Sequence, residues 1–197
     1  MTTETDTQNS SLQGAFGDRG TNVNNITYGH PHGEAILNGC KEILLESETG
    51  QILVRILNHH QIPVHIMKGT GESGFSPELK TIYLQIPGKI TKATGEVVIQ
   101  LAKAIREADQ EYAGMTAPDP MKDVVAYAGF MHARNVDSIY YVFQTIKELK
   151  NSSFFDILLD TLKNLGLNDM YKAYLEGKSK EELYDYYADA YEMREGI

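Results

Sequence analysis

The chain has 197 residues, enough for one domain with a sizeable core, and a formal net charge of −9 with a pI near 5.1. An acidic chain is repelled by phosphate backbones and by anionic lipid, so we expect neither nucleic acid nor a membrane as its main partner. Because it has no run of about 18 apolar residues, no secretory signal after Met1 and a single cysteine, Cys40, we expect a cytoplasmic protein without an internal disulfide.

Residues 1–32 are predicted to form a flexible N-terminal arm. This stretch is rich in Thr, Asn, Gln, Ser and Gly, and its scattered apolar residues are too few to offset the entropy lost on folding. The alternative is an arm that orders on a partner, with its isolated apolar side chains against the partner surface. In either case, ordered structure is expected to begin near Gly33.

Residues 33–150 are predicted to form an α+β domain that is mostly helical. Apolar residues recur there at helical spacing, and two short β-branched stretches flank a glycine-rich loop, which indicates a small sheet of two or three strands. The predicted elements are a helix from about Gly33, a helix over 49–60, strands over 62–67 and 81–86, and helices over 94–113 and about 119–150, the last opening at Asp119 and Pro120.

Residues 151–197 are predicted to be a helical extension packed on the same domain. Helices are expected over 152–165 and 168–176, and Ser179 with Glu182 forms a capping box that starts another helix. In that last helix three tyrosines share one face, because they lie at positions i, i+3 and i+7; they are Tyr184, Tyr187 and Tyr191. Such a face either packs within the chain or forms an interface with a partner.

Two patterns that could bind a cofactor or a metal are weak. Gly69, Gly71 and Gly74 match a dinucleotide-binding string, but the next predicted element is a strand rather than a helix, so we interpret them as a loop. The neighbours His59 and His60 would point about 100° apart on a helix and cannot easily share one ion. We therefore expect no cofactor and no metal, and Cys40 is interpreted as a small buried side chain.

The order of the predicted elements in 33–150 resembles that of a minimal zincin, in which one helix carries His-Glu-x-x-His and a later helix supplies a third zinc ligand. Residues 97–110, with 133–139 downstream, resemble a family of small bacterial proteins classed as metallopeptidases of unknown function. That family carries Leu-Ala-His-Glu-Leu-Arg-His-Ala-x-Gln and then Ala-x-Glu-Ala-Asp-Ala. The positions that match its framework are Leu101, Ala102, Arg106, Ala108 and Gln110.

The resemblance also implies that the catalytic groups are missing. Lys103 and Glu107 stand where the family has its two zinc-binding histidines, and Ala104 stands where it has the general base. On the later helix Val136 replaces the glutamate ligand, while Asp137 keeps the neighbouring aspartate. Lys103 is expected to pair with Glu107 one turn away, and an ammonium group at this position disfavours a divalent cation.

Our leading hypothesis is therefore a non-catalytic binding or scaffold protein on an inactivated metallopeptidase-like core, which binds a protein partner or a second copy of itself. One alternative is a hydrolase with an unconventional site, or a weak ion site, formed by Glu107, His132 and Asp137. That alternative requires the three side chains to converge at the base of a pocket. The other alternative is a helical structural component of the kind found in phage assemblies, with the N-terminal arm ordering on a neighbouring subunit.

Overall fold

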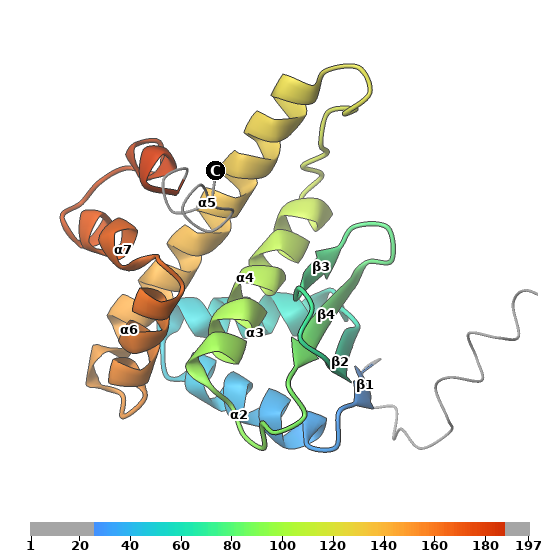
Figure 1. Cartoon of the computed structure of the whole chain (residues 1–197), viewed down its shortest axis with the longest axis vertical. Helices are drawn as coiled ribbons and strands as arrows, with labels where there is room; N and C mark the ends of the chain where they lie inside the picture. The colour runs from blue at the N-terminus through green and yellow to red at the C-terminus, as the bar shows by residue number, and fades with distance from the viewer. Residues whose placement is uncertain (1–25, 188–197) are drawn as a thin grey trace, which may run out of the picture.

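Four short strands form one mixed sheet in the order β1–β2–β4–β3 (Figure 1). In this computed structural model, which describes residues 26–187, β1 pairs in parallel with β2, β2 pairs in parallel with β4, and β3 runs antiparallel to β4 at the edge. The buried face of the sheet includes Ile66 of β2 and Leu84 of β4, which are fully buried. The strands are β1 (Ile26–Gly29), β2 (Val64–Lys68), β3 (Gly74–Ser76) and β4 (Thr81–Ile86).

The sheet is larger than the two or three strands predicted, and the predicted arm over 1–32 extends too far. β1 lies inside that stretch, and the chain after it is also ordered, because the buried His30 donates from Nε2 to the carbonyl oxygen of Pro87 at 3.2 Å. The backbone N–H and C=O groups of β1 form hydrogen bonds with β2. The composition of residues 1–32 alone does not reveal this pairing. Residues 1–25 lie outside the part of the chain that the structure describes.

The helix α4 is central to the fold. It lies between the sheet and α5, and it contacts β3, β4, α2, α3, α5 and α6 (Figure 1). Its buried residues are mostly aliphatic, and its N-terminus is capped by Thr94, whose side chain accepts a hydrogen bond from the N–H of Val97. The helices of this part of the chain are α2 (Gly33–Leu45), α3 (Glu48–His59), α4 (Gly95–Tyr112) and α5 (Val124–Glu148).

The helix α5 begins later than predicted. Asp119 and Pro120 do not start it; instead the N–H groups of Lys122 and Asp123 donate to the carbonyl oxygen of Asp119 and close a turn. The cap of α5 is Asp123, whose side chain accepts a hydrogen bond of 2.9 Å from the N–H of Ala126. Asp119 and Asp123, four residues apart, both have N-cap chemistry, and the turn between them leaves Asp123 in the capping position.

The C-terminal helices α6 and α7 pack against the helices that precede them. α6 lies against α4 and α5, and α7 lies against α5 and α6, on the side of α5 away from the sheet (Figure 1). The capping box is present, because the N–H of Ser179 donates to Oε2 of Glu182 at 2.8 Å and the N–H of Glu182 donates to Oγ of Ser179 at 3.3 Å. The elements are η1 (Leu149–Asn151), α6 (Phe155–Asn164), α7 (Asn168–Leu175) and a helical segment over 182–187.

Among residues 26–187, no helix combines the length and apolarity needed to cross a membrane.

Candidate functional site

The two positions aligned with the zinc-binding histidines form an ion pair. Nζ of Lys103 lies 2.7 Å from Oε1 of Glu107, one turn further along α4, as the sequence predicted. The other oxygen of Glu107 accepts a hydrogen bond of 3.4 Å from the N–H of Phe75 in the edge strand β3. Both carboxylate oxygens therefore already have a partner, and a divalent cation here would meet an ammonium group at contact distance.

The position of the general base is closed to water. Ala104 is fully buried in the core, and it has no group that could accept a proton. Val136 of α5, aligned with the glutamate ligand, is also buried and apolar. A reaction that needs an activated water therefore has neither a base nor a solvent path at these two positions.

The carboxylate of Asp137 lies at the centre of a polar cluster between α4 and α5. Nε of Arg106 and Nε2 of Gln110 each donate to Oδ2 of Asp137 at 2.7 Å, and Nζ of Lys180 pairs with Oδ1. Arg106 also pairs with Asp109, and its guanidinium carbon lies 4.1 Å from the ring centroid of Tyr141. Both side chains of the central pair, Arg106 and Asp137, are 18% exposed.

The pKa shifts of Arg106 and Asp137 both favour the charged form of the side chain. Burial alone would raise the pKa of Asp137, but the hydrogen bonds from Arg106 and Lys180 outweigh it and hold the pKa below its ordinary value. Burial likewise works to lower the pKa of Arg106, and the hydrogen bond and charge of Asp137 raise it above its ordinary value. Asp137 is therefore ionised at neutral pH and is not poised to exchange a proton, as a general acid or base must be.

His132 contacts a different part of the chain. Its ring stacks on Tyr184 with 3.7 Å between the centroids, and Tyr187 meets it edge-on at 4.8 Å. Nε2 of His132 donates to the carbonyl oxygen of Tyr184 at 3.2 Å. Two residues of the tyrosine face thus pack within the chain, against α5, while Tyr191 lies outside the described residues.

Glu107, His132 and Asp137 are not brought together. Glu107 faces Lys103 and β3, His132 faces the C-terminal tyrosines, and Asp137 faces Arg106 and Lys180. Within residues 26–187, no three side chains of His, Cys, Asp or Glu are arranged to hold a metal ion. The residues present therefore do not fit the zinc that the resemblance would suggest.

The remaining sequence candidates have structural roles. Gly69 and Gly71 lie in the loop between β2 and β3, and Gly74 begins β3, so the glycine string does not open a helix. His60 stacks on the ring of Tyr112 with 4.4 Å between the centroids. Cys40 is fully buried, and burial raises the pKa of its thiol to about 12, so the reactive thiolate is absent at neutral pH.

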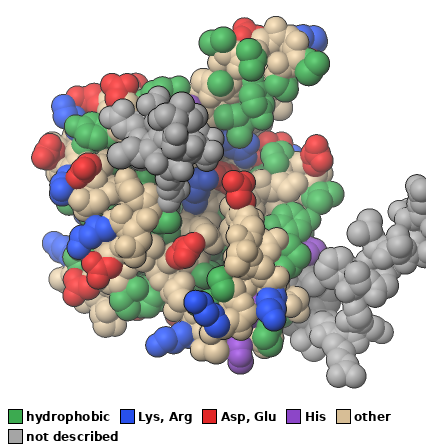
Figure 2. All heavy atoms as spheres, viewed as in Figure 1, with side chains coloured by type: hydrophobic (Ala, Val, Ile, Leu, Met, Phe, Trp, Pro, Cys, Tyr) green, Lys and Arg blue, Asp and Glu red, His purple; other side chains and the backbone are tan. Residues whose placement is uncertain are grey.

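The structure also shows a surface that sequence reasoning missed, the apolar tip formed by Met121, Val124 and Val125. These side chains are 92%, 66% and 77% exposed. They lie where α5 and the preceding loop project beyond the other helices, and hydrophobic side chains cover this end (Figures 1 and 2). The sequence shows that these residues are apolar. It does not show that the first turn of α5 projects beyond the elements that could cover it.

No protein-family model, curated protein or solved structure matches the chain. The resemblance to metallopeptidases therefore stays a hypothesis about the scaffold.

Proposed function

We propose that the chain is a non-catalytic binding protein on a metallopeptidase-like scaffold, acting on a protein partner in a reducing compartment such as the cytoplasm. The observation that carries the proposal is that the carboxylates at the motif positions are neutralised by cations of the same chain. Lys103 pairs with Glu107, and Arg106 with Lys180 pairs with Asp137. Carboxylates held in this way contribute to packing and are poor candidates for metal binding or proton transfer.

The arrangement of the elements supports the scaffold part of the proposal. A zincin-like layout requires a long helix beside a short sheet with an antiparallel edge strand, followed by a second long helix. α4 packs beside β3 and β4, β3 is the antiparallel edge strand, and α5 packs along α4. The side chains of Lys103 and Glu107 lie on the face of α4 next to β3, where the motif would place its metal.

The apolar tip supports the binding part. Monomeric proteins rarely leave large apolar side chains grouped on a projecting end, and such groups commonly mark a protein interface. The charged residues next to the tip in the sequence are Asp119, Lys122 and Asp123, and Lys122 pairs with Asp119 at 3.6 Å. A partner that covers the tip would bury apolar surface and leave these charges at the rim, where they cost little to keep solvated.

The non-catalytic assignment is tested by metal content and Zn²⁺ affinity, measured by elemental analysis and calorimetry on the wild type and on Glu107→Gln. We expect no stoichiometric zinc in either protein and no hydrolysis of a quenched peptide library with added Zn²⁺. Glu107→Gln keeps the size of the side chain and a hydrogen-bond acceptor for Phe75, so the fold is preserved. One tightly held ion in the wild type that is lost in Glu107→Gln would overturn the proposal.

A further inference from the structure

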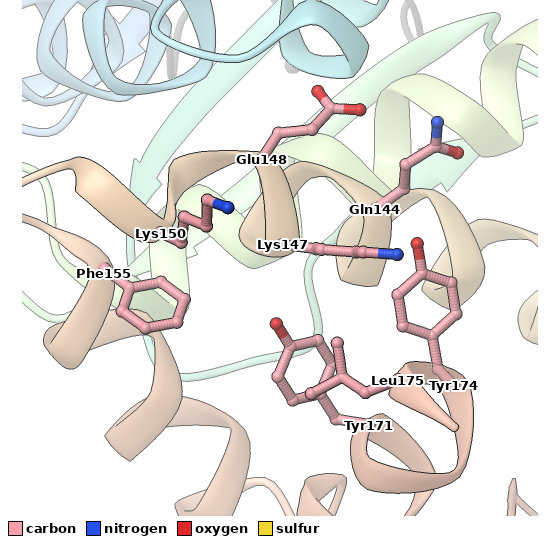
Figure 3. A pocket seen from close by; sticks show the side chains of 8 residues that line it. All are labelled: Gln144, Lys147, Glu148, Lys150, Phe155, Tyr171, Tyr174 and Leu175. Carbon is pink, nitrogen blue, oxygen red and sulfur yellow. The ribbon is translucent and has the colours of Figure 1, made fainter. Parts of the chain in front are cut away.

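A cavity of about 580 Å³ lies where the C-terminal half of α5 and η1 meet α6 and α7 (Figure 3). This volume is in the range of sites that bind single small molecules. The cavity is on the opposite end of α5 from the apolar tip and does not include the aligned motif positions. Its lining includes Lys147, Lys150, Phe155, Tyr171, Tyr174 and Leu175.

The cavity carries two cations without an acidic partner. Neither Lys147 nor Lys150 forms an ion pair with a carboxylate anywhere in residues 26–187, although the chain as a whole has a net charge of −9. Nζ of Lys147 lies 5.6 Å from the ring centroid of Tyr174, which also lines the cavity. Two solvated ammonium groups three residues apart give this site a local positive charge.

Glu148 is the acidic side chain of the lining, and its carboxylate is engaged elsewhere. Its two oxygens accept hydrogen bonds from the N–H of Thr49 at 2.7 Å and from Oγ1 of Thr49 at 2.6 Å. In Figure 3 the carboxylate points away from Tyr171. It lies at the N-terminal turn of α3, whose positive dipole end offsets part of its charge, and its single charge is smaller than the combined charge of the two lysines.

Two tyrosine hydroxyls complete the polar part of the cavity. Within residues 26–187, Oη of Tyr171 and Oη of Tyr174 form no hydrogen bond. Every buried side-chain polar atom in that range has a partner, so these two hydroxyls are not buried and reach the solvent of the cavity. Burial raises the pKa of Tyr171. Burial, helped by the charges of Tyr140, Tyr171 and Glu148, raises the pKa of Tyr174 to about 12, so both groups are hydrogen-bond donors at neutral pH.

The remaining walls are apolar. Phe155 of α6 lies on one side, and Leu175 of α7, which is 50% exposed, lies on the other, beside the two tyrosine rings (Figure 3). An aromatic or branched body would bury its surface between these side chains. From these contacts we propose that the cavity binds a small molecule with an anionic carboxylate or phosphate head, held by Lys147 and Lys150, and an apolar body.

The ligand class is tested on the full-length chain with naphthalene probes, whose fluorescence anisotropy reports binding directly. We expect 1-naphthoate and 1-naphthyl phosphate to bind, and neutral 1-naphthol to bind about tenfold more weakly, because it lacks the charge-assisted hydrogen bonds. The anion that binds with the higher affinity shows whether the site prefers a carboxylate or a phosphate head group. Equal binding of the neutral probe, or no binding of either anion at millimolar concentration, would overturn the proposal.

The location is tested with two double variants that remove the same net charge. Lys147→Met with Lys150→Met should weaken binding of the anionic probe about tenfold or more. The control, Lys163→Met with Lys172→Met, changes two exposed lysines on α6 and α7 that pair with Asp160 and Asp169, and it should leave binding unchanged. Equal weakening in both variants would show a diffuse effect of net charge and would refute the site.

A third variant tests the hydroxyl donors separately. Tyr171→Phe keeps the aromatic wall and should weaken the anion two- to tenfold, with little effect on neutral 1-naphthol, because roughly 1 kcal/mol is typical of one hydrogen bond. Equal loss of both probes would mean that Tyr171 contributes only shape and would remove it from the head-group site. The outcome is independent of the proposed protein partner, whose surface is at the other end of α5.

Discussion

Asp137→Ala should destabilise the fold by about 2 kcal/mol, because it removes the carboxylate that joins α4, α5 and the C-terminal segment. The lost contacts are hydrogen bonds from Arg106 and Gln110, each 2.7 Å long, and the ion pair with Lys180. One hydrogen bond to a charged group is worth about 1.5–3 kcal/mol. The pair with Lys180 adds little, because that side chain is 41% exposed and solvent screens it.

Two structural details keep the estimate below the cost of breaking a fully buried pair, about 3–5 kcal/mol. Arg106 keeps its second partner, Asp109, after the substitution. Alanine is also a better helix former than aspartate, and this offsets roughly 0.5 kcal/mol of the loss in unfolding free energy. For a chain of this size, a loss of about 2 kcal/mol corresponds to a fall in Tm of roughly 4–8 °C.

The assay is urea unfolding followed by far-UV circular dichroism, and the matched control is Asp160→Ala in α6. Within residues 26–187, Asp160 pairs only with Lys163, and both side chains are largely exposed, so the control should change the free energy of unfolding by less than about 0.5 kcal/mol. Both variants replace a helical aspartate with alanine, so helix propensity cancels between them. Equal changes in the two variants would refute the assignment of Asp137 as a link between the helices.

Acid provides an independent check on Asp137. Since the folded-state pKa of this carboxyl lies below its ordinary value of about 4, its ionisation stabilises the fold above that value. The contribution is lost as the pH falls through the lower, folded-state pKa. The difference in stability between the wild type and Asp137→Asn should therefore be constant near pH 7 and shrink below about pH 4. A difference that grows on acidification would contradict the direction of the pKa shift.

Two further substitutions test packing and exposure. Gly50→Ala should cost about 2 kcal/mol or more in urea unfolding, because its Cβ would overlap the carbonyl oxygen of Leu44 and would lie 2.6 Å from the capping Oγ of Ser47. Gly129→Ala should instead stabilise the fold by up to about 1 kcal/mol, because Gly129 has a helical backbone and open space around it. Val124→Ser with Val125→Ser should reduce self-association in sedimentation velocity at high protein concentration while changing stability little, because both side chains are exposed; unchanged association would exclude the apolar tip as the contact.

The helices were predictable because their signal is local. Apolar spacing placed helices over 49–60 and 94–113, and the structure has them over Glu48–His59 and Gly95–Tyr112. The strands β1 and β3 were not predicted. β1 pairs with a strand distant in the sequence, with Ile26 opposite Val64, whereas β3 has three residues and pairs with the next strand along the chain, β4. A short strand with little apolar pattern of its own can be recognised only once its partner is known.

The same distinction holds within the candidate site. The ion pair of Lys103 with Glu107 spans one helical turn and follows from the spacing alone. The pairs that define the rest of the site cross long stretches of chain: Lys180 reaches Asp137, and His132 stacks on Tyr184. No spacing rule connects these residues, so the sequence could name His132 and Asp137 as candidates but could not show that they point to different partners.

The residues on which the proposed metallopeptidase resemblance rests have structural contacts in the fold. Arg106 and Gln110, which match the family framework, are the α4 side chains that hold Asp137 of α5. Arg134 extends this link, since its guanidinium donates to the side chain of Gln110 and to the carbonyl oxygen of Glu107. The resemblance therefore falls on residues that fix how two helices pack, a need that exists with or without a reaction.

The positions that depart from the family lie on the face of α4 toward the edge strand. There Lys103 and Glu107 satisfy each other, and Ala104 fills the core. An ion pair at these positions is compatible with the packing of α4, and this agrees with the binding function that we propose. Within residues 26–187, the lysines at the far end of α5 and the apolar tip at its start are the surfaces on which our binding proposals rest.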